Sequence, residues 1–311
     1  MKFVPSDANI EDLNRALKFE TLFDERTAEI KYKVACFHQM KVKVFYPSMR
    51  IEIFGSLHKC YNSIAGIHAP NQTGPEHRKK GYNGNGFPYT RMRYTIDYIC
   101  RRLGLNDQTC YISNLEIGLN IVHPYSDRKV LTNLMRHVGV AFHETQKNYF
   151  EAEHAQYIVK CYDKGRQYKL SKPTIRIELK YRKMEALNMP TFTTLNDLKN
   201  KQMLAAFCNR LTNKWLEVLM YDYTIRENEL KPTDARKLPL FKNSSYWNEE
   251  LNPKRLDRPK KDLTRIILNH SENIQDYFTK RIKSDWNQLQ KNCVTIDRLF
   301  KGVKPWEMCN H

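Results

Sequence analysis

Three segments of the chain carry polar side chains at every second position, the spacing that places side chains on one face of a β-strand. These positions are Glu116, Gly118 and Asn120 in the first segment, Lys160, Tyr162 and Lys164 in the second, and Arg176, Glu178 and Lys180 in the third. Most of the positions between them are apolar. If the three strands are neighbours in one sheet, a single face carries two carboxylates, a tyrosine, an asparagine and several cations.

This set of side chains is suited to metal-assisted phosphoryl transfer. Glu116 and Glu178 would hold Mg²⁺ or Mn²⁺, because these hard cations prefer oxygen ligands, and the metal would polarise a scissile phosphate. Tyr162 would attack that phosphate and form a phosphotyrosine. A tyrosine hydroxyl has an ordinary pKa of about 10, so the metal or Lys164 would have to stabilise the phenolate.

Further polar residues would assist this chemistry. Arg176 and Lys180 would neutralise charge on the phosphate as the transition state forms. The predicted DNA-binding residues are Lys59, Lys160, Arg176 and Lys180. Two more residues, His58 and Asn120, are candidates for orienting groups or ligands.

Each of these side chains also has a plainer interpretation. From spacing alone, Glu116 and Glu178 are more typical of solvent-facing strand residues paired with cations. Tyrosine favours strands, and Tyr162 is one of 18 tyrosines. The histidines form no His-x-His or HExxH pattern, and there is no GxxxxGK[ST] motif of a nucleotide-hydrolysing motor.

The pattern of apolar residues predicts the elements that would position these groups. Strands are expected at 42–46, 50–54, 111–122, 157–163 and 174–182, and helices at 12–23, 92–103, 124–142, 194–221 and 262–289. A long loop is expected at 62–88, and a Pro- and Lys-rich stretch at 223–261. We therefore predict an α+β fold, a mainly antiparallel sheet with packed helices, followed by a helical C-terminal region. The similar sequences Arg50-Ile-Glu-Ile and Arg176-Ile-Glu-Leu hint at an internal duplication.

Composition points to a polyanionic partner. The formal net charge is +18 and the pI is about 9.5, and Lys and Arg outnumber Asp and Glu by 44 to 27 in residues 50–311 but only by 8 to 7 in residues 1–49. The eight cysteines form no CxxC pair, and no apolar run approaches the roughly 18 residues needed to span a bilayer. We expect a cytoplasmic DNA-binding protein that has no membrane partner.

Four segments in order resemble the replication initiators of filamentous phages, the gene-II-type proteins and their phage-X relatives. The segments are Arg50–Lys59, Ile112–Ile121, Ile158–Gly165 and Thr174–Lys180, and the resemblance covers roughly residues 42–222. It implies a rolling-circle initiator nuclease-like domain at 42–223, after an N-terminal segment at 1–41. The resemblance does not extend to the basic, helical region at 224–311, which we expect to bind DNA or a partner.

The resemblance also implies an activity. Members of this family nick one strand of a replication origin, stay attached to the 5′ end, leave a 3′-OH for a host polymerase and later rejoin the strand. By position, Tyr162 matches the proposed nucleophile, and Glu116 and Glu178 match acidic residues that are natural metal ligands. The chain lacks the histidine–hydrophobe–histidine motif of the wider superfamily.

The expected partners are therefore single-stranded or supercoiled origin DNA and host replication proteins, in a bacterial host cell. Two alternatives stay open at this point. One is an origin-binding protein without catalysis, and the other is a mobilisation relaxase with the same tyrosine chemistry.

Overall fold

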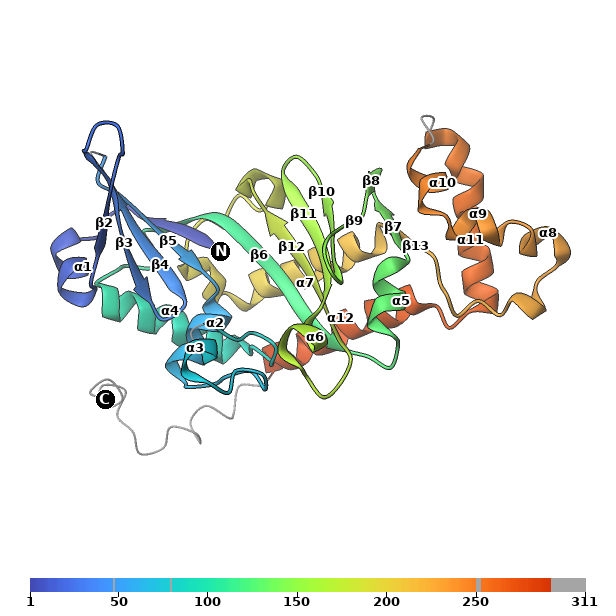
Figure 1. Cartoon of the computed structure of the whole chain (residues 1–311), viewed down its shortest axis with the longest axis horizontal. Coiled ribbons are helices and arrows are strands. Elements are labelled where there is room, and N and C mark those ends of the chain that lie inside the picture. The colour runs from blue at the N-terminus through green and yellow to red at the C-terminus, as the bar shows by residue number, and fades with distance from the viewer. Residues whose placement is uncertain (47, 79, 250–252, 292–311) are drawn as a thin grey trace. The chain divides into compact units, whose positions relative to one another are not determined.

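The computed structural model describes residues 1–46, 48–78, 80–249 and 253–291 (Figure 1). It is an α+β structure with extensive antiparallel sheet and packed helices, as the sequence predicts. Contacts divide the chain into two units. Unit 1 comprises Met1–Ser113, Pro190–Met203 and the chain from Trp286, and unit 2 comprises Asn114–Met189 and Leu204–Asp285. This division follows contacts between residues and differs from the boundaries expected at 41 and 223.

Unit 1 begins with an antiparallel sheet whose strands lie in the order β2-β3-β4-β5-β1. The elements are β1 (Lys2–Pro5), α1 (Ile10–Ala16), β2 (Glu20–Phe23), β3 (Ile30–Phe37), β4 (Met40–Phe45), β5 (Arg50–Gly55), α2 (Leu57–Ile64), α3 (Pro75–Arg78) and α4 (Tyr89–Leu103). In α4, Ile96, Ile99 and Leu103 are buried along one side of the helix. Gly104 ends this helix in the left-handed conformation, as the sequence predicts.

Unit 2 contains a second antiparallel sheet, with strands in the order β6-β12-β11-β10-β9. Its elements are β6 (Cys110–Val122), α5 (Asp127–Thr132), β7 (Leu134–His137), β8 (Val140–Ala141), β9 (His143–Gln146), β10 (Tyr149–Glu153), β11 (Tyr157–Asp163), α6 (Lys164–Tyr168), β12 (Thr174–Tyr181), α7 (Lys201–Leu216), β13 (Val218–Met220), α8 (Pro232–Ala235), α9 (Leu238–Lys242), α10 (Ser244–Asn248), α11 (Asp257–His270) and α12 (Ile274–Lys291). Strands β13, β7 and β8 form a small separate sheet.

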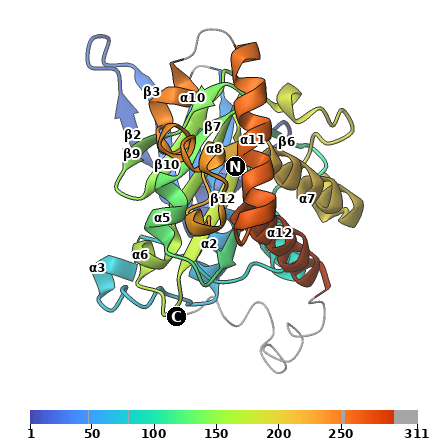
Figure 2. The same ribbon diagram turned by 90° about the vertical axis from the view of Figure 1, so that its right-hand side faces the viewer.

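In the central strands of the unit 2 sheet, the alternating apolar residues all lie on one face. Ile117, Leu119, Cys161, Ile177 and Leu179 are all buried. Helices α7 and α12 lie along one face of this sheet (Figures 1 and 2), and the buried side of α7 supplies apolar side chains of its own. Because the strand period is two, the opposite face receives every intervening polar residue.

Three predicted helices differ from the structure. The helix expected at 124–142 is present only as α5, which ends at Thr132. The chain then forms β7 and β8, and positive φ angles at Val138 and Gly139 turn it between these two strands. The helix expected at 12–23 ends at Ala16 and is followed by a strand. The helix expected at 194–221 begins at Lys201 and ends at Leu216, and a strand follows it.

The C-terminal region also differs in detail. The helix expected at 262–289 is divided into α11 and α12, because Ser271 is extended and Asn273 has a φ of 52°. The Pro- and Lys-rich stretch at 223–261 contains α8, α9 and α10. A core holds these helices together, formed by Met135, Tyr221, Ile225, Leu238, Phe241, Trp247, Leu256, Leu263 and Ile266. Residues 292–311 of the predicted C-terminal region lie outside the described residues.

Candidate functional site

The three polar segments are adjacent strands, so their polar residues do share one face of the unit 2 sheet. Strand β12 lies between β6 and β11. Across it, Lys160 pairs with Glu178 and Glu178 with Gly118. We call this surface the polar sheet face, and it comprises Glu116, Gly118, Asn120, Lys160, Tyr162, Arg176, Glu178 and Lys180.

Glu178 is at the centre of the polar sheet face and is only 4% exposed. Its Oε2 lies 2.6 Å from Arg176 Nε, and its Oε1 lies 3.4 Å from Lys160 Nζ. The hydroxyl of Tyr162 donates to Oε2 over 3.4 Å. Burial by itself would raise the pKa of Glu178, but Arg176 and Lys160 lower it to about 2. Glu178 is therefore an anion that binds cations and is poorly suited to accept a proton.

Lys160 joins the two carboxylates of the face. Its Nζ lies 3.2 Å from Glu116 Oε1 in addition to its contact with Glu178. Lys180 approaches Glu116 more loosely, at 3.8 Å. Burial would lower the pKa of Lys160, but Glu178 and Glu116 raise it above its ordinary value. The ammonium group therefore occupies the position between the carboxylates that a divalent cation would need.

Gly118 gives the side chains of β12 room to lie across β6. A Cβ at this position would lie 2.9 Å from Arg176 Nη2 and 3.0 Å from Glu178 Cβ. The same arginine donates from Nη1 to Asn120 Oδ1 at 3.1 Å. Asn120 therefore orients Arg176, and Gly118 allows the guanidinium group to reach both partners. Close approach of a neighbouring side chain is a recognised reason for glycine within a strand.

Tyr162, the predicted nucleophile, is 9% exposed. Burial and then the neighbouring Glu178 raise the pKa of its hydroxyl, while Arg176 opposes this effect. Its ring stacks on Tyr149 of β10, with centroids 4.5 Å apart. Sequence reasoning missed Tyr149, because β9 and β10 were not predicted. The alternation of buried Phe150 and Ala152 was the available signal.

Lys164 is close to Tyr162 but reaches it from a helix and not from the strand. Asp163 ends β11 and caps α6 by accepting from Arg166 N, which makes Lys164 the first residue of that helix. Its Nζ lies 5.0 Å from the centre of the Tyr162 ring and donates to Gln167 Oε1 at 2.8 Å. The expected proximity is present, and the expected shared strand face is wrong.

His58 and Lys59 both lie in α2, in unit 1. The His58 ring stacks on Phe87 with centroids 4.6 Å apart, and its Nε2 lies 2.6 Å from Asn85 Oδ1. These contacts account for the burial of His58. The amide of Lys59 donates to Ser56 Oγ, which caps the helix.

The donor set for a metal ion is small. Within the described residues, no group of three or more His, Cys, Asp or Glu side chains is placed to hold one. Glu116 and Glu178 nevertheless point at one shared cation, the ammonium group of Lys160. The carboxylates of the two predicted ligands therefore lie around one position that a cation occupies. A metal ion would have to compete with the ammonium group of Lys160 for that position.

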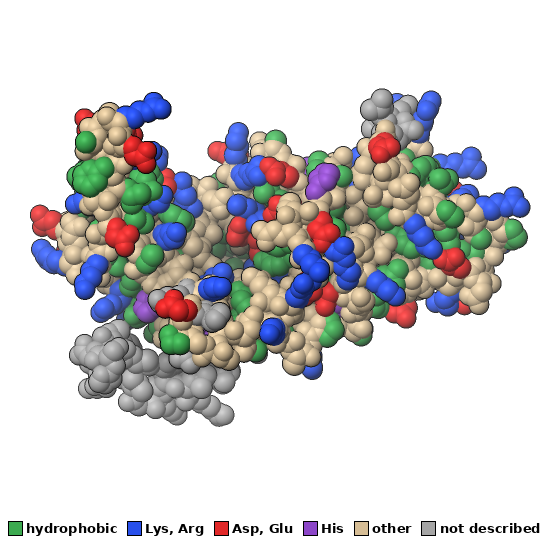
Figure 3. Space-filling model, viewed as in Figure 1, with side chains coloured by type: hydrophobic (Ala, Val, Ile, Leu, Met, Phe, Trp, Pro, Cys, Tyr) green, Lys and Arg blue, Asp and Glu red, His purple; other side chains and the backbone are tan. Residues whose placement is uncertain are grey.

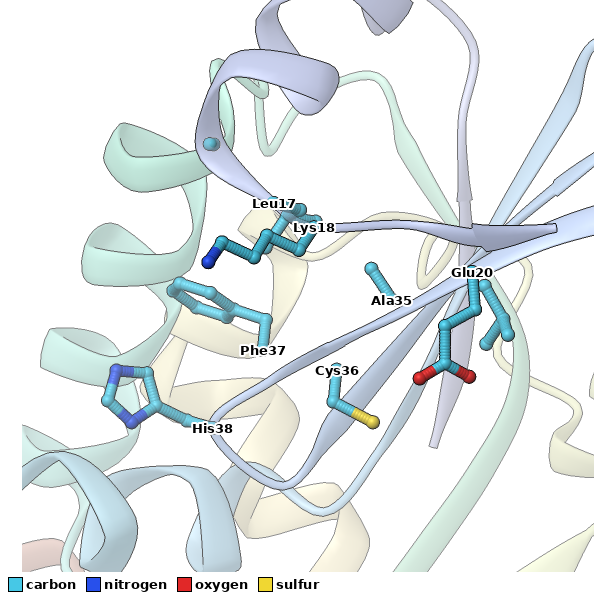
Figure 4. A pocket seen from close by; sticks show the side chains of 9 residues that line it. Leu17, Lys18, Glu20, Ala35, Cys36, Phe37 and His38 are labelled. Atoms are coloured by element: carbon cyan, nitrogen blue, oxygen red, sulfur yellow. The ribbon is translucent and has the colours of Figure 1, made fainter.

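The remaining surface features include a pocket and scattered charged side chains. A pocket of about 490 Å³ in unit 1 is lined by residues 16–18, Glu20 and 34–38 (Figure 4), none of which is a predicted site residue. Lys and Arg side chains are scattered over the face seen in Figure 3, with Asp and Glu between them. Among the described helices, none combines the length and apolar character needed to cross a membrane.

No family model and no curated protein matches this chain.

Proposed function

We propose that this protein nicks and rejoins DNA through a covalent 5′-phosphotyrosine at Tyr162, and so initiates rolling-circle replication of a phage or plasmid. The observation that carries the proposal is the position of Tyr162 directly opposite Arg176 and next to the Lys160–Glu178 pair, on adjacent strands of the polar sheet face. The order of the four sequence segments supports it, as does the net charge of +18.

In the proposed reaction the phenolic oxygen of Tyr162 attacks the scissile phosphorus. A new P–O bond to tyrosine forms while the P–O bond to the 3′ oxygen breaks. The phenol gives up its proton to water, and the departing 3′ oxygen takes up one proton from water. Arg176 and Lys160 bear the positive charge that would stabilise the phosphate in the transition state. Attack by the same 3′-OH on the phosphotyrosine reverses the step and rejoins the strand.

Glu116 and Glu178 would hold a divalent ion, Mg²⁺ or Mn²⁺, which would neutralise charge on the scissile phosphate when bound. For this, the ammonium group of Lys160 would have to move away from its position between the carboxylates. A displaced Lys160 would then be available to contact the phosphate. The proposal therefore requires an exchange of partners on the polar sheet face when DNA and metal bind.

A second candidate is an origin-binding protein without catalysis. One observation favours it: Tyr162 is buried and hydrogen-bonded to Glu178, so its oxygen is poorly placed to attack until the face rearranges. A mobilisation relaxase would share the first mechanism and differs only in the DNA it acts on.

The experiment that separates these candidates uses the full chain, supercoiled DNA of its own element and Mg²⁺. We expect open circular DNA with protein attached, and peptide mapping that places the 5′-phosphate on Tyr162. Tyr162→Phe should bind the same DNA and form no adduct. DNA binding without an adduct in the unaltered protein, with either metal, would favour the binding-only candidate.

A further inference from the structure

The sheets of the two units have the same strand order. Unit 1 runs β1, α1, β2, β3, β4, β5 along the chain and orders its strands β2-β3-β4-β5-β1. Unit 2 runs β6, α5, β9, β10, β11, β12, with β7 and β8 inserted, and orders its strands β9-β10-β11-β12-β6. In both, the first strand along the chain pairs with the last. We call Lys2–Gly55 the first copy and Cys110–Tyr181 the second copy.

The registers of the two copies also agree, pair by pair. Lys43 opposite Glu52 in the first copy corresponds to Lys160 opposite Glu178 in the second. One step along the same face, Phe45 opposite Arg50 corresponds to Tyr162 opposite Arg176. On the next strand, Tyr32 opposite Phe45 corresponds to Tyr149 opposite Tyr162.

The side-chain contacts match as well. Arg50 Nη2 lies 3.1 Å from Glu52 Oε1, as Arg176 lies against Glu178. Lys43 Nζ lies 4.1 Å from the centre of the Tyr32 ring, and Lys160 similarly lies beside Tyr149. The similarity of Arg50-Ile-Glu-Ile and Arg176-Ile-Glu-Leu is therefore part of a repeated structure and not a coincidence of four residues.

Three substitutions separate the copies chemically, and one of them is Phe54 in place of Lys180. Phe45 stands where Tyr162 stands, so the first copy has no nucleophilic oxygen there. Lys2, paired with Phe54, stands where the second copy has Glu116, paired with Lys180. The first copy therefore loses one of the two carboxylates and gains a cation, which lies 2.8 Å from Glu52 Oε1.

What the first copy retains is suited to binding a single strand of nucleic acid. Its face presents three aromatic rings, those of Tyr32, Phe45 and Phe54, together with nearby cations. The side chain of Arg50 is 57% exposed, and its guanidinium carbon lies 5.0 Å from the centre of the Phe45 ring. Aromatic platforms for bases, combined with cations for phosphates, are the usual means of binding single strands, at about 1–3 kcal/mol per stacked base.

We infer that the face formed by Tyr32, Lys43, Phe45, Arg50 and Phe54 is a second site for single-stranded DNA, one that binds the strand and cannot cut it. The choice of DNA as ligand rests on the proposed function, whereas the repeat and the presence of Phe45 at the position of Tyr162 do not.

The test is photo-cross-linking of the full chain to a short single-stranded oligonucleotide containing 4-thiothymidine, followed by peptide mapping. We expect cross-links in β3–β5 of the first copy as well as in β10–β12 of the second. Arg50→Ala and Phe45→Leu should each reduce the first-copy cross-links at least severalfold and leave the second-copy ones in place. Arg101→Ala, which removes an exposed cation from α4, is the matched control and should change neither.

The outcomes separate the two proposals. Cross-links confined to β10–β12, in protein shown to be folded by circular dichroism, overturn the second site and leave the nicking proposal standing. Cross-links in β3–β5 with no covalent adduct at Tyr162 support the second site and count against nicking. Cross-links in neither copy overturn the second site and leave the nicking proposal to its own adduct assay. First-copy cross-links that persist in both Arg50→Ala and Phe45→Leu also overturn the second site, because the named side chains would then not be the ones that bind the DNA.

Discussion

The ring of Tyr149 stacks on the ring of Tyr162 at a centroid separation of 4.5 Å, and the two hydroxyl-bearing side chains face the same charged surface. Burial raises the pKa of Tyr149 to about 12, although Lys160 acts in the opposite direction. The phenol groups of Tyr149 and Tyr162 are therefore both candidates for the proposed nucleophile. Tyr162 lies directly opposite Arg176, whose guanidinium group would bear charge opposite the phosphate, and this position is the reason to propose Tyr162 as the nucleophile.

We predict that Tyr149→Phe forms the covalent DNA adduct at close to the unaltered rate, because phenylalanine keeps the ring stacking, worth about 0.5–1.5 kcal/mol. Tyr162→Phe should form none. Mass spectrometry of the trapped adduct is the measurement, with Tyr157→Phe as a control. The Tyr157 ring stacks on His154, away from the polar sheet face. An adduct lost in Tyr149→Phe and kept in Tyr162→Phe would reverse the assignment.

Gly118→Ala should destabilise the protein by about 1–3 kcal/mol, the usual cost of overpacking, and should weaken DNA nicking. The added methyl group would displace Arg176 or Glu178, whose atoms lie about 3 Å from its position. Urea denaturation measures the first effect. Gly86→Ala is the matched control, because its methyl group would meet only Leu289 at 3.6 Å, and it should change stability by less than about 0.5 kcal/mol. Equal stability of the two variants would contradict the packing we describe.

Lys160→Met should strengthen divalent ion binding by about tenfold or more, because it removes a competing cation from between two carboxylates. Mn²⁺ affinity can be measured without any DNA by titrating each protein with Mn²⁺ and monitoring the titration by electron paramagnetic resonance. Lys180→Met, whose ammonium group is farther from Glu116, should have the smaller effect. If Mn²⁺ affinity is the same in all three proteins, Glu116 and Glu178 do not form the ion site.

The ion pairs of Glu178 predict a loss of stability in acid. Its folded-state pKa of about 2 lies below the ordinary 4.5, so its contribution is present above pH 4.5 and is lost as the pH falls toward 2. The full contribution is on the order of 3 kcal/mol. The difference in unfolding free energy between the unaltered protein and Glu178→Gln should therefore shrink between pH 6 and pH 3.

Denaturation at the two pH values tests this directly. Glu153→Gln is the control, because the side chain of Glu153 is 57% exposed and pairs with Arg182 at the surface, where ion pairs contribute little. Its difference from the unaltered protein should stay nearly constant. A Glu178→Gln difference that does not shrink in acid would show that the carboxylate is not held ionised by Arg176 and Lys160.

The polar sheet face could be predicted from sequence because strand geometry alone decides it. Alternation at Glu116, Lys160 and Glu178 assigns a face to each residue, and the pairing of β6, β12 and β11 then brings the faces together. Local capping places Lys164 differently. Asp163 ends β11, as the expected range 157–163 has it, and caps α6, so Lys164 does not continue the alternation of the strand.

The parts that sequence reasoning missed depend on turns and on long-range pairing. The stripe formed by Leu134, Met135 and Phe142 has helical spacing, yet Val138 and Gly139 adopt positive φ and form a hairpin turn. Tyr149 gains its position only through the pairing of β10 with β11. The short likeness between Arg50-Ile-Glu-Ile and Arg176-Ile-Glu-Leu was visible in sequence, but its meaning required the strand order of both sheets.

The repeat has an evolutionary consequence. Two copies of a sheet within one polypeptide are most simply explained by duplication and fusion of a gene for a single copy, whose product would have had two identical faces when paired. Fusion allows each copy to acquire its own mutations. Position 45 can therefore hold phenylalanine while position 162 holds tyrosine, whereas in a symmetric pair of identical chains one substitution would change both faces.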